Sequence, residues 1–63
     1  MSWLEVRETD ETYLLLNVDR ISTIGQDEEG SVVWLDNGMR LKIDAPFFAL
    51  REEIRRIAER KDS

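Results

Sequence analysis

The fold of this chain is decided by the stretch SVVWLDNGMRLKI, residues 31–43. Two apolar runs flank Asn37-Gly38, and Asn-Gly between such runs is typical of a two-residue type I′ hairpin turn, in which both central residues have a positive φ. The stretch therefore predicts an antiparallel hairpin with strands over residues 31–36 and 39–43.

A two-residue turn also fixes the strand register. It pairs Asp36 with Met39, Leu35 with Arg40, Trp34 with Leu41, Val33 with Lys42, and Val32 with Ile43. Directly paired residues share a face of the sheet. One face is then almost entirely apolar and is assigned to the core: Val32, Trp34, Met39, Leu41 and Ile43. The opposite face carries Val33 and Leu35 beside two basic residues.

The N-terminal half predicts two more strands. Residues 3–7 alternate in polarity, and residues 12–18 form a second strand that continues as extended chain over 21–24. Residues 25–30 read as an acidic loop with a glycine at each end.

The C-terminal part predicts one amphipathic helix over about residues 46–60. Four apolar residues recur at helical spacing, namely Phe47, Leu50, Ile54 and Ile57. The fold class is therefore α+β: an antiparallel four-strand β-meander followed by one C-terminal helix. Curling of the sheet into an SH3-like barrel is left open.

Length and composition limit the class of protein. The chain has 63 residues, which indicates a single domain with a thin core, and it contains neither cysteine nor histidine. No apolar run approaches the roughly 20 residues needed to cross a bilayer. The N-terminus also lacks the basic start and long apolar stretch of a signal peptide. We therefore expect a cytoplasmic protein that does not enter a membrane.

Catalytic chemistry has little basis in this sequence. The serines have no histidine to activate them, and the three glycines are isolated, so no phosphate-binding loop is present. The acidic residues 27–29 lack the alternating ligand spacing of a calcium loop. We expect no enzyme activity, no metal and no cofactor.

The second apolar side of the sheet is the main functional feature, because one helix covers only one side. A curled sheet, a second copy of the chain or another protein would each bury it. The residues predicted for this interface are Leu15, Val33, Leu35 and Phe48. The leading hypothesis is a protein–protein adaptor or regulatory accessory protein that self-associates, with a dimer favoured.

The alternative is a small nucleic-acid-binding regulator. It would use Arg40, Lys42, Arg51 and Arg55 to contact phosphates. The formal net charge of −5 disfavours this alternative, because an acidic chain repels nucleic acid.

Two segments together resemble a known family. The run YLLLNVDRISTI (residues 13–24), followed by VWLDNGM (33–39), is similar to small proteins of the flagellar FlbD/SwrD type. With a closing strand and helix, the resemblance covers residues 3–57. It implies an accessory protein of a motility or regulatory operon, with no cofactor and no catalytic residues.

Overall fold

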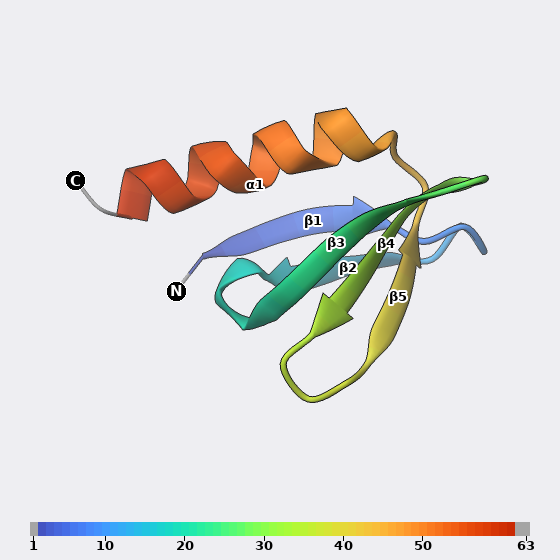
Figure 1. Ribbon diagram of the computed structural model, residues 1–63, viewed down its shortest axis with the longest axis horizontal. Helices are drawn as coiled ribbons and strands as arrows, with labels where there is room; N and C mark the ends of the chain where they lie inside the picture. Colours follow the sequence, from blue (N-terminus) through green and yellow to red (C-terminus); the bar gives the residue numbers. More distant parts are fainter. Residues whose placement is uncertain (1, 62–63) are drawn as a thin grey trace.

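Five strands, a single 3-10 turn and one α-helix follow one another along residues 2–61, the part that the computed structural model describes (Figure 1). The elements are β1 (Trp3–Arg7), β2 (Tyr13–Asn17), η1 (Val18–Arg20), β3 (Ile21–Asp27), β4 (Gly30–Leu35), β5 (Arg40–Ile43) and α1 (Phe47–Lys61). The α+β class and the C-terminal helix are confirmed.

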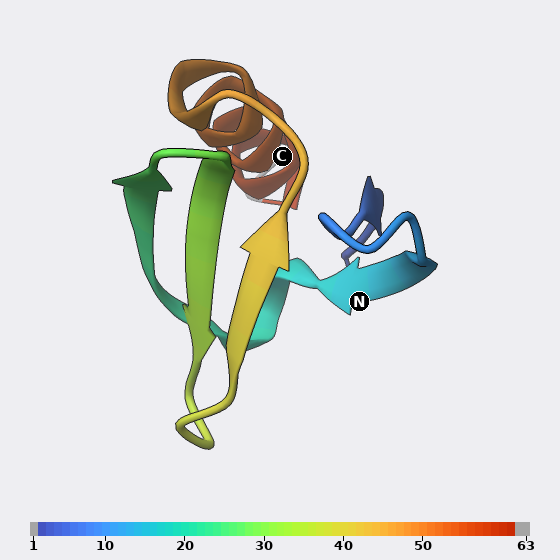
Figure 2. The same cartoon turned by 90° about the vertical axis from the view of Figure 1, so that its right-hand side faces the viewer.

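The strands form two antiparallel sheets instead of one four-stranded meander. β1 pairs with β2, and β3, β4 and β5 form the second sheet. The predicted extension over 21–24 belongs to the separate strand β3, because η1 turns the chain after β2. A bridge between Glu8 and Ile43 joins the two sheets at one corner. From there the β1–β2 ribbon is steeply inclined to the three-stranded sheet (Figure 2).

The acidic loop predicted over residues 25–30 is wrong, because the observed turn is shorter. β3 continues to Asp27 and β4 begins at Gly30, so that only Glu28 and Glu29 form the turn. Gly30 has a φ of +150°, and a Cβ there would clash with the carbonyl of Ile43. Gly30 therefore packs directly on the chain that leads into α1.

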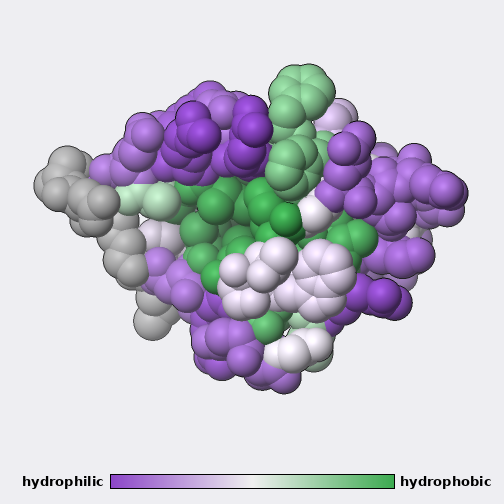
Figure 3. All heavy atoms as spheres, viewed as in Figure 1, coloured by the Kyte–Doolittle hydropathy of each residue, from purple (hydrophilic) through white to green (hydrophobic). Residues whose placement is uncertain are grey.

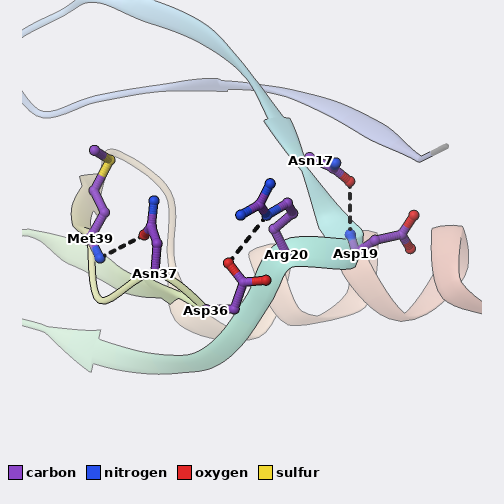
Figure 4. Close-up of polar contacts among 6 residues, drawn as sticks. All are labelled: Asn17, Asp19, Arg20, Asp36, Asn37 and Met39. Carbon is purple, nitrogen blue, oxygen red and sulfur yellow. Dashed lines mark hydrogen bonds and ion pairs between the residues drawn. The ribbon is translucent and has the colours of Figure 1, made fainter.

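The hairpin predicted between residues 31 and 43 is present, but its loop has three residues. The Leu35 N–H donates to the Met39 carbonyl at 2.9 Å, and the Gly38 N–H donates to the Leu35 carbonyl at 3.0 Å. Gly38 has a φ of +89°. Asn37 does not have a positive φ, and its Oδ1 accepts the Met39 N–H at 2.9 Å (Figure 4). The type I′ prediction is therefore wrong.

The longer loop shifts the predicted register by one residue. The observed pairs are Ser31 with Ile43, Val32 with Lys42, Val33 with Leu41, and Trp34 with Arg40. A shift of one residue moves every side chain of a strand to the other face. Val33 is consequently buried in the core, whereas Trp34 lies on the outer face with Arg40. The core assignment of Trp34 was wrong.

The core lies between α1 and the inner faces of both sheets. Its buried cluster consists of Val6, Leu16, Val33, Ile43 and Leu50. Each such side chain contributes about 1.5–3 kcal/mol when it is fully buried. Leu50 is the buried residue that α1 contributes to this core. It lies in the first turn of the helix, and its N–H donates to the Pro46 carbonyl. The predicted apolar face of the helix is therefore confirmed for Leu50, which is buried, and for Ile54, which packs against the core.

Candidate protein-binding groove

Large apolar side chains remain exposed on the folded chain, chiefly on the β1–β2 ribbon and the β4–β5 loop. The exposed ones among the described residues are Trp3, Tyr13, Leu15, Trp34, Met39 and Phe48. Three of them lie on the outer face of the ribbon, because in β1 and β2 the odd-numbered residues face away from the core. A small protein that leaves such a face uncovered has a candidate contact surface.

This face continues into a groove of about 480 Å³, here named the leucine groove. Its apolar lining comes from Trp3, Leu14, Leu15, Leu16, Leu35, Met39 and Leu41, and its polar rim from Glu8, Asn17, Arg20 and Asn37. The lining is contributed by three separate parts of the chain: the β1–β2 ribbon, the end of β4, and β5 with its loop. The tertiary fold therefore creates the groove.

The groove is open because β2 has no neighbour on its outer side. Within the described part of the chain, β2 is hydrogen-bonded to β1 alone. Its residues, Tyr13 to Asn17, are all uncharged. An uncharged, unpaired strand edge beside apolar side chains is suited to receive an extended peptide segment.

An ion pair and a backbone hydrogen bond connect the two sides of the groove wall. Arg20 Nε contacts Asp36 Oδ1 at 3.2 Å, and the Asp36 N–H donates to the Arg20 carbonyl at 2.8 Å (Figure 4). Both side chains are more than half exposed, so the ion pair itself contributes little to stability. The two contacts tie the β4–β5 hairpin to η1 and so fix the position of Met39 relative to β2.

The four predicted interface residues do not form one surface. Leu15, which is 63% exposed, and the half-buried Leu35 both line the leucine groove. Val33 is fully buried and belongs to the core. Phe48 is 64% exposed but lies at the start of α1, in a separate cleft beside the β3–β4 turn.

The four predicted basic contacts also separate into two pairs. Arg40 and Lys42 lie exposed on the outer face of β5. Arg51 and Arg55 lie on α1, where each contacts Glu52 Oε1, at 3.5 and 3.6 Å.

Of the eleven residues that line the leucine groove, sequence reasoning assigned only Leu15 and Leu35 to an interface, and it missed the two most exposed apolar residues among the others, Trp3 and Met39. Met39 is predicted on the face of Leu41 and Ile43, but it lies at the end of the hairpin, beyond the core, where it is 54% exposed. Trp3 could have been found from the alternation of residues 3–7, since Val6 faces the core and odd positions therefore face outward.

Comparison with known proteins gives no match: no family model fits the chain, and neither the curated proteins nor the solved structures contain a similar one. The resemblance to the small flagellar family stays a prediction. Over residues 2–61, no helix is long and apolar enough to span a membrane. The same residues contain no cluster of three or more side chains of the types that bind metals.

Proposed function

We propose that this protein is a non-enzymatic, cytoplasmic protein–protein adaptor that binds an apolar segment of a partner protein in the leucine groove. The observation that carries the proposal is the position of this groove beside the unpaired, uncharged edge of β2. A role as a regulatory accessory protein, as in the family that the sequence resembles, agrees with a surface built for binding.

The chemistry of the groove favours an extended apolar segment. Its walls are leucine, methionine and tryptophan side chains, and its rim carries one acidic and one basic residue, Glu8 and Arg20. A partner strand placed along β2 would gain main-chain hydrogen bonds, and its alternate side chains would enter the groove.

The test is a pair of matched substitutions, Leu15→Glu and Phe48→Glu. Both residues are large, apolar and almost equally exposed, but only Leu15 lines the leucine groove. In quantitative pull-downs from the source cells, wild type and Phe48→Glu should retain the same partner, and Leu15→Glu should lose it. Circular dichroism should show that all three chains are folded. Retention of that partner by Leu15→Glu would refute the groove as the binding site.

A second candidate function, nucleic-acid binding, is favoured by one observation. Trp34 lies directly opposite Arg40 on the outer face of the three-stranded sheet, and Lys42 projects from the same face. Stacking of a base on an indole beside two cations is a common way to bind single strands. This candidate predicts that single-stranded RNA binds at low salt, that Trp34→Ala weakens the binding, and that added salt abolishes it. No binding at low salt would eliminate it.

A further inference from the structure

Among the four edge strands of the described residues, β1 and β5 carry charged side chains, and β3, like β2, is almost free of them. β3 is hydrogen-bonded to β4 alone within residues 2–61, and Figure 2 shows it as the outermost strand of its sheet. It has seven residues, and the first six, Ile21 to Gln26, carry no charge. Proteins ordinarily protect such edges with charges, proline or bulges. The irregularity between Ile21 and Thr23 protects only the start of this strand.

An apolar surface lies next to this edge. Figure 3 shows hydrophobic side chains gathered between α1 and β3, on the side of the molecule toward which β3 faces. Ile24 of β3 and Ile54 of α1 are half-buried and pack against the core from this side, and Ile57 of α1 is also half-buried. A chain that pairs with β3 would therefore also cover these isoleucines.

Opposite charges lie at the two ends of the β3 edge. The acidic residues Asp27, Glu28 and Glu29 end the strand and form its turn, whereas Asp19 and Arg20, whose charges balance, precede it. The C-terminal half of α1, which carries Arg55 and other arginines, lies toward the Arg20 end of the strand (Figure 1). An antiparallel copy of the same edge would place the acidic end of each chain beside the basic end of the other.

We propose that two copies of this chain pair through their β3 strands, antiparallel, across a two-fold axis at Ile24. This inference rests on the self-association that the sequence led us to expect and assigns it to a site outside the leucine groove. The result is one continuous six-stranded sheet with both α1 helices on the same side.

The register follows from symmetry. A two-fold axis perpendicular to the sheet requires the central residue of the interface to face its own copy. Ile24 is the middle residue of Ile21–Asp27, so this axis overlaps all seven positions. Just beyond the strand ends it brings Glu28 opposite Arg20 of the other copy, and one position further Glu29 opposite Asp19. An axis at Thr23 would oppose Asp27 and Asp19 and would form no pair of opposite charges.

The edge of β2 is less suited to a second copy. β2 has five residues, against seven in β3. Asp10 and Glu11 precede β2, and Asp19 and Arg20 follow it. Self-pairing of β2 about Leu15 would make Glu11 and Asp19, two acidic residues, the first charged pair beyond the strand ends, whereas in self-pairing of β3 the first such pair is Glu28 and Arg20.

Single cysteines test the geometry directly, because the chain has none of its own. In the proposed dimer the two Ile24 residues lie directly opposite, with Cα atoms about 4.5–5.5 Å apart, within the range of a disulfide. Ile24→Cys should therefore give a covalent dimer under mild oxidation. Thr23→Cys is the matched control, since its Cα atoms would lie about 8 Å apart, beyond disulfide range. Equal cross-linking of both variants, or of neither, would overturn the proposed register.

Solution mass provides the second test. Wild type should sediment as a dimer at micromolar concentration, and Thr23→Lys should dissociate it, with a Kd raised on the order of tenfold or more by like charges near the axis. Thr12→Lys, another exposed threonine with the same charge change, should remain dimeric. A monomeric wild type, or a dimer that survives Thr23→Lys, would overturn the β3 interface. A dimer lost in Leu15→Glu but kept in Thr23→Lys would place self-association in the leucine groove instead.

Discussion

Trp34 lies directly opposite Arg40 across β4 and β5, on the outer face of the three-stranded sheet. This pairing places Val33, its neighbour in sequence, on the inner face, where it is fully buried. The register of the hairpin thus determines which of two adjacent apolar residues holds the core together and which is available for binding.

Charged substitutions at these two neighbours should therefore have opposite outcomes. We expect Val33→Asp to unfold the protein, because an unpaired charge cannot be buried in the core without a large loss of free energy. Trp34→Glu should remain folded, since that side chain is 37% exposed. Far-ultraviolet circular dichroism with urea unfolding measures both. If Val33→Asp stayed folded and Trp34→Glu unfolded, the register predicted from a two-residue turn would be correct instead.

The sequence was sufficient for β1, β2, the hairpin and the helix, but insufficient for η1, for the length of β3 and for this register. Periodicity located the helix to within one residue at each end, since α1 covers Phe47–Lys61. The Asn37-Gly38 pair correctly indicated a hairpin. It did not distinguish a two-residue loop from a three-residue loop, because a glycine with positive φ ends either one. That single residue of difference misplaced Val33 and Trp34.

The groove was only partly predictable for a different reason. Leu15 could be placed outside the core from the alternation of its own strand. The groove itself depends on how the β1–β2 ribbon is inclined to the other sheet, and this follows from η1 and from the bridge between Glu8 and Ile43. The bridge joins residues that are far apart in the sequence, and no local pattern encodes such a contact.

Two glycines should respond differently to the same substitution. Gly30→Ala should destabilise the fold strongly, because the new Cβ would clash with the backbone of Ile43 and would lie 3.1 Å from the Ala45 carbonyl oxygen. Gly38→Ala should cost only about 1 kcal/mol, from the positive φ alone, since nothing lies within 4 Å of its Cβ position. Thermal unfolding of the two variants gives the comparison. Equal losses would contradict the close packing of Gly30 on β5.

Ser31 should contribute a measurable hydrogen bond to stability. Its side chain is 1% exposed, and its Oγ donates to the Ala45 carbonyl at 2.7 Å. Ser31→Ala removes this donor from a part-buried carbonyl, and the free energy of unfolding should fall by about 1–3 kcal/mol. Ser22→Ala, an exposed serine of β3, is the control and should change it by less than about 0.5 kcal/mol. Denaturant unfolding measures both variants.

Asp10 should show a depressed pKa in the folded chain. The Thr12 N–H donates to its Oδ1 at 3.0 Å, and this hydrogen bond lowers the pKa of the carboxyl from its ordinary value of 3.8. Because the folded pKa lies below the unfolded one, the stabilisation is present above the unfolded pKa and is lost as the pH falls through the folded pKa. A titration followed by carboxyl carbon NMR measures the shift. In Thr12→Pro, which lacks the N–H donor, the Asp10 pKa should return toward its ordinary value.

The two edge strands with little charge, β2 and β3, also limit how copies of this chain can assemble. When β3 meets β3, the pairing uses the same edge twice and stops at two chains. If β2 of one chain met β3 of the next, each addition would leave another free edge, and the assembly would grow into an open-ended filament. Occupation of the β2 edge by a partner, or of the β3 edge by a second copy, would each block such growth, so a filament would require both edges to be free.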